Sequence, residues 1–293
     1  MRRGRLGSVP RRHQELVRKC RRRESRPEES WSIHMSRHPK PPSRSTSVEE
    51  PKSSPRRTTD ADAALSAVAL AKDYGDGPAL LPLDLDVAAA ERVALIGHNG
   101  SGKTTFLRLA TGLLEPASGS VTVFCHAPGS LEARRRLSYL ADTPTFYEDL
   151  SVWEHLEYTA RLHGVAVWEQ RAADLLGQLG IYERADDLPT RFSRGLKQKA
   201  AIAIAFVRPF DVMLVDEPFV GLDAEGKEAL IDLFDEASAA GAALVVATHE
   251  LGFVAKARRT IALRDGALIF DGPSSEAQAR GLVSVEGAAE TEN

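Results

Sequence analysis

Hydrophobic residues along this chain follow two different periods, and the change between them divides the chain into regions. From residue 64 to residue 124, short apolar stretches alternate with polar positions or form continuous runs, as β-strands do. Clusters of Gly, Pro, Asp and Ser separate these stretches and predict turns. The predicted strands span residues 64–74, 80–87, 92–96 and 120–124. A helix is predicted at residues 103–114, where apolar positions take a helical spacing.

Helical periodicity dominates the next region, at about residues 130–208, for example over residues 152–162 and 170–179. Strand patterns then return at residues 212–215, 243–248, 260–263 and 267–270. An Asp265-Gly266 pair joins the last two strands as a predicted hairpin turn. The order of these patterns predicts an α/β fold that is interrupted by an inserted α-helical subdomain.

The two ends of the chain differ from this folded part in composition. Residues 1–60 carry 17 Lys and Arg against 7 Asp and Glu and hold few large apolar residues, so they cannot bury enough surface to fold alone. We favour a solvated linker, or a start codon assigned upstream of Met35, over a basic arm that binds anionic lipid or nucleic acid. The predicted domain therefore spans residues 61–273, and a polar tail follows at residues 274–293.

Cysteine content and hydropathy indicate in which cellular compartment the protein is expected. Two isolated cysteines, Cys20 and Cys125, make no disulfide framework and fit a reducing cytosol. No apolar run approaches the roughly 18 residues that cross a bilayer, and the N-terminus lacks the apolar core of a secretory signal. Any relation to a membrane is therefore expected to be peripheral or through a partner.

The most specific motif lies between the strand at residues 92–96 and the helix that follows it. The pattern G-x-x-x-x-G-K-[ST] is typical of a loop that binds the phosphates of a nucleoside triphosphate. Glycines let several backbone N–H groups converge on one anion, and the helix adds the positive end of its dipole. Lys103 is expected to reach the β- and γ-phosphates, and the Thr104 hydroxyl to bind Mg²⁺. The predicted nucleotide-binding residues of this loop are Gly97, His98, Asn99, Gly100, Ser101, Gly102, Lys103, Thr104 and Thr105.

Two acidic residues follow the apolar run at residues 212–215. Carboxylates at the C-terminal end of a buried strand lie in the crevice where α/β sheets bind ligands. Asp216 is expected to hold Mg²⁺, directly or through water. Glu217 is expected to be the catalytic base that polarises the attacking water.

A second anion site is predicted where Ser193 and Gly195 precede a helix of small apolar residues at 200–207. The serine hydroxyl, the backbone N–H groups and the helix dipole would converge there. From the residues alone, Ser193 can also be a plain N-cap without a ligand.

Taken together, these motifs resemble those of the nucleotide-binding subunit of ABC transporters. The stretch FSRGLKQK at residues 192–199 is similar to the family signature LSGGQ, and Val220-Gly221-Leu222-Asp223 is similar to the D-loop. His249 follows a strand as the switch histidine does, and Tyr74 precedes the phosphate loop as the adenine-stacking aromatic does. The motifs occur in the family's order from residue 64 to about residue 273.

The resemblance implies a P-loop NTPase core with a mixed sheet, an N-terminal antiparallel β part and the inserted helical subdomain. It also implies a head-to-tail dimer around two ATP molecules, each bound to one phosphate loop and capped by Ser193 and Gly195 of the other copy. His249 is then expected to contact the γ-phosphate, and Asp223 to link the two sites. Tyr74 stacks on adenine in this interpretation, although ordinary packing also explains it.

Three positions depart from the family pattern. Arg194 and Leu196 stand where glycine and glutamine are usual in the signature, a variant similar to that of exporter-type subunits. Asp142 stands where the Q-loop glutamine contacts Mg²⁺ and the attacking water, so a shorter, charged metal ligand is expected. Ala90-Glu91 replaces a common Gly-Glu turn.

The function that the resemblance implies is ATP hydrolysis that drives transport, with an exporter-type signature, through separate membrane-spanning subunits. The chain would form a homodimer, or a heterodimer with another ATP-binding subunit, in the cytoplasm at the inner face of the membrane. No nucleic acid is expected to bind. Residues 146–154 match the groove that receives the membrane subunit, although core packing explains Trp153 equally well.

Two other functions compete with transport. ABC ATPases that act on ribosomes usually carry two cassettes in one chain, and those of DNA repair carry long coiled coils, whereas this sequence indicates neither. An unrelated phosphate-loop enzyme, such as a small-molecule kinase, leaves the signature, the D-loop and His249 unexplained.

Overall fold

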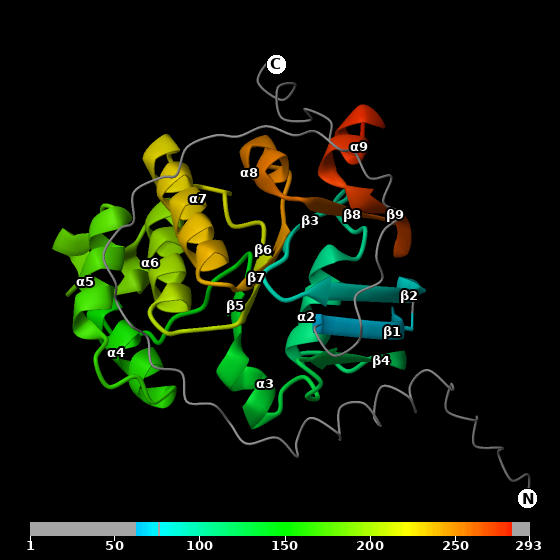
Figure 1. The fold of residues 1–293 in the computed structure, drawn as a ribbon. Coiled ribbons are helices and arrows are strands. Elements are labelled where there is room, and N and C mark those ends of the chain that lie inside the picture. The colour runs from blue at the N-terminus through cyan, green and yellow to red at the C-terminus, as the bar shows by residue number, and fades with distance from the viewer. Residues whose placement is uncertain (1–62, 76, 283–293) are drawn as a thin grey trace, which may run out of the picture.

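The computed structural model describes residues 63–75 and 77–282, which form two β-sheets and the helices around them (Figure 1). The predicted extension at residues 1–60 lies outside the described residues, as does most of the predicted polar tail. In Figure 1 the smaller sheet lies on the right, and helices α4 (Val152–Leu162) and α5 (Glu169–Gln178) lie on the left. The larger sheet runs between them.

The smaller sheet has three antiparallel strands in the order β2–β1–β4. They are β1 (Ala63–Asp73), β2 (Pro78–Ala88) and β4 (Ser118–Val123). Both pairings shift register near Ala69, whose left-handed φ of 46° marks a bulge. This sheet is the N-terminal antiparallel part that the family resemblance implied.

The larger sheet has six strands in the order β5–β6–β7–β3–β8–β9. They are β3 (Arg92–Ile96), β5 (Leu137–Leu140), β6 (Val212–Asp216), β7 (Ala243–Ala247), β8 (Arg259–Arg264) and β9 (Ala267–Pro273). The first five strands in that order are parallel, and β9 is antiparallel to β8. Strands β3, β6 and β7 are buried along their whole length, as parallel strands are when both faces are covered.

Helices follow the strands and fill the insertion. Those outside the insertion are α2 (Lys103–Thr111), α3 (Leu131–Arg136), α7 (Ala224–Ala239), α8 (Leu251–Lys256) and α9 (Ser274–Ala279). The insertion holds α4, α5, the 3₁₀ turns η1 (Tyr182–Arg184) and η2 (Pro189–Arg191), and α6 (Arg194–Phe206). Among the described residues, no helix combines the length and apolar content that crossing a bilayer requires.

Strand β5 falls inside the range 130–208, where the sequence pattern predicts helices. It follows α3 directly and pairs in parallel with β6, so it extends the larger sheet. Four residues carry too little periodicity to distinguish a strand from the helical pattern on either side. The domain boundaries themselves stay predictions.

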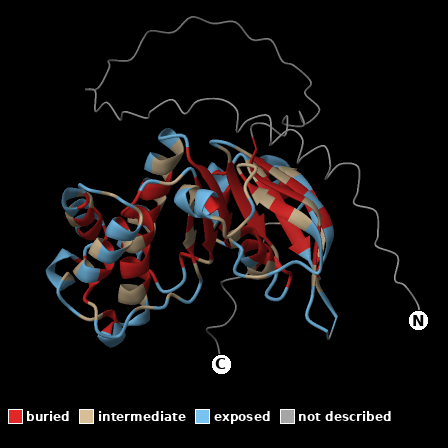
Figure 2. Ribbon diagram, turned by 90° about the horizontal axis from the view of Figure 1, so that it is seen from below, coloured by how far each residue is buried: buried red, intermediate tan, exposed pale blue. Residues whose placement is uncertain are grey.

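The larger sheet separates two hydrophobic cores. Val93 and Leu95 of β3 point to a core that is shared with α2 and the smaller sheet, which contributes Leu65. The alternate residue Ala94 points to the other core, which includes Leu156 of α4. Figure 2 shows the buried strands at the centre, with exposed residues on the outer helix faces.

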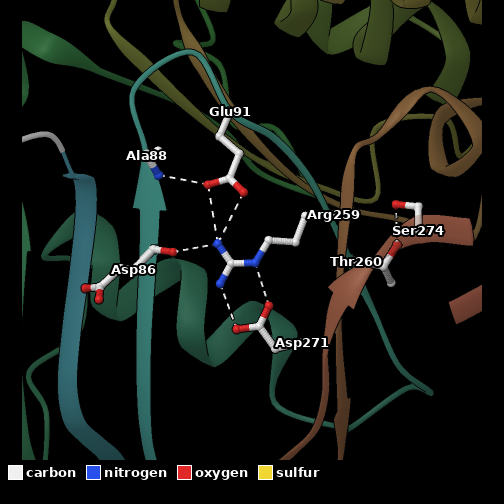
Figure 3. A network of polar contacts seen from close by, with 7 residues as sticks. All are labelled: Asp86, Ala88, Glu91, Arg259, Thr260, Asp271 and Ser274. Carbon is white, nitrogen blue, oxygen red and sulfur yellow. Dashed lines mark hydrogen bonds and ion pairs between the residues drawn. The ribbon is translucent and has the colours of Figure 1, made fainter. Parts of the chain in front are cut away.

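The guanidinium of Arg259 connects the two sheets (Figure 3). Its Nε and Nη2 donate to the Asp271 carboxylate of β9 at 2.5 and 2.7 Å. Its Nη1 donates to the Asp86 carbonyl of β2 at 2.8 Å and lies 3.2 Å from Glu91 Oε1 in the turn before β3. Burial lowers the pKa of Arg259, but Asp271 and Glu91 outweigh it and raise that pKa above its ordinary value. The cation therefore stays charged and fixes the smaller sheet to the edge of the larger one.

We expect Arg259→Ala to lower the free energy of unfolding by about 2 kcal/mol, because it leaves two partly buried carboxylates without their cation. The matched control is Arg161→Ala, since the Arg161–Glu157 pair on α4 is largely exposed and contributes about 0.5 kcal/mol or less. Urea unfolding of both variants measures the difference. Equal losses in the two variants would show that Arg259 does not brace the sheets.

Candidate nucleotide-binding site

The phosphate loop leaves β3 and enters α2. Gly97 has a φ of 151°, and a Cβ atom there would overlap the Leu263 carbonyl and lie 2.5 Å from Ser101 Oγ. Only glycine fits this position. Gly102 is the N-cap of α2, and the helix has neither a side-chain cap nor an acidic residue in its first turn. The first N–H groups of α2 are therefore not engaged by a side-chain cap and are available to an anion.

Two neighbouring segments hold the phosphate loop from outside. In the turn between β8 and β9, the Gly266 N–H donates to the Ser101 carbonyl at 3.1 Å. The Asp265 carboxylate of the same turn lies 3.1 Å from His98 Nε2. The Leu81 N–H of β2 donates to the Gly266 carbonyl at 2.8 Å. Both sheets thus fix the shape of the loop.

A cleft of about 640 Å³ opens at the phosphate loop. It combines the loop with the acidic end of β6, the histidine after β7 and the segment after β5. Its lining residues are Ala79, His98, Asn99, Gly100, Ser101, Gly102, Lys103, Thr104, Thr105, Asp142, Asp216, Glu217, Val220 and His249. Of the predicted loop residues, only Gly97 is not part of this lining. The structure therefore brings together residues from five separate predicted motifs, namely the phosphate loop, the Q-loop, the acidic strand end, the D-loop and the switch histidine.

Glu217 lies between the two basic side chains of the cleft. Its Oε1 is 3.6 Å from Lys103 Nζ and 3.4 Å from His249 Nε2. Lys103 Nζ also donates to the Gly97 carbonyl at 2.5 Å. Glu217 has a left-handed φ of 44°, which is uncommon outside glycine. Such strain concentrates at functional positions, where the surrounding structure fixes the backbone.

Asp216 is nearly inaccessible, with 1% of its surface exposed. Burial raises the pKa of its carboxyl above the ordinary value, against the lowering effect of a hydrogen bond from the Thr104 side chain. The nearby Asp142 carboxylate raises that pKa further. Asp216 Oδ1 is buried and has no hydrogen-bond partner, which is costly unless a cation binds there.

These residues fit a Mg²⁺ ion that binds together with a nucleotide. Mg²⁺ usually takes one or two carboxylates and completes its shell with phosphate oxygens and water. Asp216 offers the orphaned oxygen, Thr104 lies beside it, and Asp142 lines the same cleft. Within residues 63–75 and 77–282, no group of three or more His, Cys, Asp or Glu side chains can hold a metal ion by itself. Tight metal binding is therefore expected only with the nucleotide.

Tyr74 does not line the cleft. Its ring is 55% exposed in the turn after β1, and Lys72 Nζ lies 5.3 Å from the ring centroid. The ring is not part of a packed core, so the packing interpretation has no support. Stacking of Tyr74 on adenine stays a prediction.

Ser193 and Gly195 also lie outside the cleft. Ser193 is exposed and is the N-cap of α6, where its Oγ accepts the Leu196 N–H at 3.4 Å. Gly195 packs directly on the D-loop, because a Cβ atom at this position would lie 2.5 Å from the Gly221 carbonyl. The signature and the D-loop therefore form one surface in the same chain.

Asp223 ends the D-loop and is the N-cap of α7. Its side chain accepts the Gly226 N–H at 2.9 Å and pairs with Lys199 of α6 at 3.0 Å. The Lys199 hydrogen bond is the largest cause of a lowered pKa at Asp223. This ion pair connects the signature helix to the D-loop.

Sequence reasoning missed several residues of this region. Ala79 lines the cleft, Asp265 contacts the phosphate loop, and Lys199 pairs with Asp223. Val220, named from the sequence only as part of the D-loop motif, also lines the cleft. The Asp265-Gly266 turn was recognisable as a hairpin, but its place beside the loop depends on the pairing of β8 with β3. Lys199 was visible only as the last residue of the stretch FSRGLKQK, directly before the predicted helix at residues 200–207, and that position carries no sign of a pairing with Asp223.

Burial raises the pKa of Glu217, and Asp216 adds to the effect, while Lys103 opposes it. A carboxyl whose pKa is higher in the folded than in the unfolded state destabilises the fold when it is ionised. The loss in free energy of unfolding is fully present above the folded-state pKa and absent below the unfolded-state pKa. We expect Glu217→Gln to raise the melting temperature of the nucleotide-free chain at neutral pH. The gain should disappear as the pH falls through the folded pKa of Glu217.

Asp223→Asn is the control variant, and its expected change in stability has the opposite sign. The pKa of the Asp223 carboxyl is lowered in the folded chain, and asparagine still caps the helix. It should reduce stability at neutral pH, and this loss should vanish at acid pH. Thermal scans across pH measure both effects. If Glu217→Gln destabilises the chain at neutral pH, the ionised Glu217 carboxylate does not destabilise the fold.

Comparison with known proteins finds relatives that are named as ATP-binding proteins of transporters. Residues 80–220 match the family model described as ABC transporter. The SkfA peptide export ATP-binding protein SkfE of Bacillus subtilis (strain 168) is 34% identical over 205 residues, covering 69% of this chain and 86% of that protein. The ABC-type transporter ATP-binding protein EcsA of the same organism is 35% identical over 193 residues, covering 64% of this chain and 77% of that protein.

A solved structure described as the ATP binding subunit of an ABC transporter is 30% identical, with a TM-score of 0.69. The match covers 75% of this chain and 94% of that chain. This likeness confirms the predicted fold class, a P-loop NTPase core with a mixed sheet, an antiparallel β part and a helical insertion. With the relatives above, it shows that the chain belongs to the family of ABC transporter ATP-binding subunits.

Proposed function

We propose that the chain is the ATP-hydrolysing subunit of an ABC exporter and acts on ATP with Mg²⁺ in the cleft at the phosphate loop. The observation that carries the proposal is the convergence of Lys103, Asp216, Glu217 and His249 on one cleft of about 640 Å³. A phosphate loop alone binds a nucleotide, but a carboxylate beside it can also activate water for attack.

The triphosphate binds to the N–H groups of the loop and of the first turn of α2. Lys103 then exchanges the Gly97 carbonyl and the Glu217 carboxylate for β- and γ-phosphate oxygens. Thr104 and Asp216 hold Mg²⁺, with Asp142 near them, and the ion neutralises charge on the phosphates when bound. The contact of His98 Nε2 with the Asp265 carboxylate at 3.1 Å holds the loop to the turn between β8 and β9.

Glu217 acts as the general base in this proposal. Release from Lys103 leaves its carboxylate free to accept a proton from water as the water oxygen attacks the γ-phosphorus. The bond to the leaving ADP oxygen then breaks. Burial raises the pKa of Glu217, which makes it a stronger base than an exposed carboxylate. His249, 3.4 Å from Glu217 Oε1, orients the base and contacts the γ-phosphate.

The site is completed by a second subunit, identical or different. Ser193 is exposed and does not line the cleft of its own chain, so its hydroxyl and the N–H groups at the start of α6 are presented outward. A head-to-tail dimer would place this surface over the γ-phosphate of the other copy, and Asp223 beside the shared boundary. No nucleic acid is required.

Separate membrane-spanning subunits are the proposed partners, and the chain acts at the cytoplasmic face of the membrane through them. Export is supported by the relative named as a peptide export ATP-binding protein and by the Arg194 signature variant. The transported substrate would contact the partner rather than this chain.

Mixing two inactive variants tests the composite site. Lys103→Ala removes the phosphate contact, and Ser193→Arg blocks the outward surface, so each alone should lose ATP hydrolysis. In a mixed dimer, one site keeps both Lys103 and Ser193, and we expect hydrolysis to return on mixing. Crosslinking between differently tagged copies verifies that subunits have exchanged and that mixed dimers are present. Mixed dimers that form without any recovered hydrolysis would refute the shared site, and a chain that never self-associates would require a heterologous partner subunit.

Gly195→Ala tests the packing of the signature on the D-loop. The new methyl group would meet the Gly221 carbonyl at 2.5 Å, and backbone must move to admit it. We expect hydrolysis to fall by about 10–100-fold, because small displacements of positioning groups have effects of this size. Nucleotide binding to one subunit should be unchanged.

Gly177→Ala is the matched control, since a Cβ at this exposed position in α5 meets nothing within 4 Å. It should keep full activity and gain about 0.5–1 kcal/mol of stability. Steady-state ATPase assays and nucleotide titrations separate the two variants. Equal activity in both would contradict a role for this packing.

A further inference from the structure

The segment between β5 and α4 connects the nucleotide cleft to an exposed aromatic surface. It starts at Asp142, which lines the cleft, and reaches Tyr147, whose ring is 54% exposed. Tyr158 of α4 is 45% exposed and lies against Tyr147, with ring centroids 5.4 Å apart. Trp153 takes no part in this surface, because it packs against Trp168 and the core. Core packing therefore explains Trp153, whereas the rings of Tyr147 and Tyr158 are exposed at the surface.

One buried histidine holds this segment to the start of α4. His155 is 5% exposed, and its Nε2 accepts the Tyr147 backbone N–H at 2.9 Å. Its Nδ1 lies 2.7 Å from the Ser151 carbonyl. The Phe146 ring packs edge-on against the imidazole at 5.5 Å between centroids. Among the described residues 143–150, the Tyr147 bond is the one hydrogen bond shorter than 3.5 Å that a backbone N–H donates.

The two backbone partners determine the protonation state of His155. A backbone N–H can only donate, so Nε2 must carry a lone pair rather than a proton. A carbonyl can only accept, so Nδ1 must carry the proton. The arrangement therefore requires the neutral imidazole with its proton on Nδ1. A second proton would place an Nε2–H against the Tyr147 N–H, and both donors would lose their partner in a buried site.

We propose that His155 is a positioning residue for the segment 142–150, and that its protonation releases this segment from α4. Neutral His155 fixes the Tyr147 backbone by accepting its N–H. It thereby fixes the segment that connects Tyr147 to Asp142. The imidazolium cannot accept the Tyr147 N–H, so either the ring or the segment must move. The consequence for ATP hydrolysis rests on the proposed function, whereas the release itself is a property of the nucleotide-free chain.

Titratable side chains near His155 come from the segment 142–150 and from α4. Tyr147 stacks on the imidazole with ring centroids 5.9 Å apart, and Tyr158 packs edge-on against Tyr147 at 5.4 Å between centroids. A phenol carries no negative charge unless it is ionised, so these rings offer no carboxylate-like counter-charge to an imidazolium. Glu154 is the adjacent carboxylate, and it is engaged by the Ser151 N–H at 2.7 Å in the capping box of α4. Glu154 therefore has a partner of its own, and the hydrogen-bond partners of the imidazole are the Tyr147 N–H and the Ser151 carbonyl.

Hydrogen exchange of the Tyr147 amide tests the proposal on the full chain without nucleotide. Protection, corrected for the intrinsic exchange rate, is measured by NMR from about pH 8 to about pH 5.5, across the usual titration range of histidine. We expect it to fall by about tenfold or more as the pH decreases. The Val165 amide, which donates to the Ala160 carbonyl in the same subdomain, is the internal control and should keep its protection.

Two variants separate titration from structure. His155→Gln keeps an uncharged acceptor at the Nε2 position, so the Tyr147 amide should stay protected at every pH. His155→Asn is too short to reach Tyr147 but can still bond to Ser151, so protection should be low at every pH. Thermal unfolding of both confirms that the fold is retained. Should one variant fail to fold, the other still decides the outcome when compared with the wild-type pH profile.

A wild-type profile without pH dependence would overturn the proposal, and so would a His155→Gln profile that falls as the wild type does. In the ATPase assay, the acid loss of kcat should be smaller in His155→Gln than in the wild type, with nucleotide affinity equal in the two. If exchange behaves as expected but hydrolysis is absent in all variants, the positioning role stands and the proposed function fails.

Discussion

The candidate site depends on the register of three parallel strands. Leu95 of β3 and Asp216 of β6 both pair with Ala247 of β7, so the three strands end at one level. The Thr248 N–H donates to the Leu95 carbonyl at 3.2 Å, and the Glu217 N–H donates to the Ala247 carbonyl at 2.9 Å. The residues that follow these strands must therefore meet at one edge. A shift of one residue in any pairing would turn the functional side chain to the opposite face of the sheet.

This convergence has a cost in the nucleotide-free state. The burial of Asp216 and Glu217 raises the pKa of both carboxyls, and one buried oxygen of Asp216 has no partner. The Lys103–Glu217 contact relieves only part of this cost, because its 3.6 Å length exceeds that of a hydrogen bond. A cation that binds with the nucleotide would supply the missing positive charge, because the triphosphate is itself an anion. The unfavourable electrostatics of the two carboxylates thus favour cation binding and explain why the fold around the site must be over-determined by the sheet.

Local patterns predicted the parts of this site that one segment determines. Gly97–Thr105 was identifiable because spacing, glycine content and the strand–helix context all lie within one short stretch. The acidic end of β6 was identifiable for the same reason. The contact of Asp265 with His98, and the position of Ala79 in the cleft, arise from pairing between distant strands. Sequence periodicity contains no information on such pairings, and the same limit hid β5, whose four residues join the sheet only through β6.

Ser193 shows why a structural and a functional interpretation of one residue need not exclude each other. Its Oγ accepts the Leu196 N–H at 3.4 Å, which is a long bond for a cap. A hydroxyl that accepts one hydrogen bond can still donate its own proton to a phosphate oxygen. The cap also fixes the start of α6, where the N–H groups of Arg194 and Gly195 have no partner in the helix. Packing of Gly195 against the Gly221 carbonyl keeps this start close to the D-loop. A helix start that is capped by its own serine can therefore still present N–H groups to the anion that the proposed function places there.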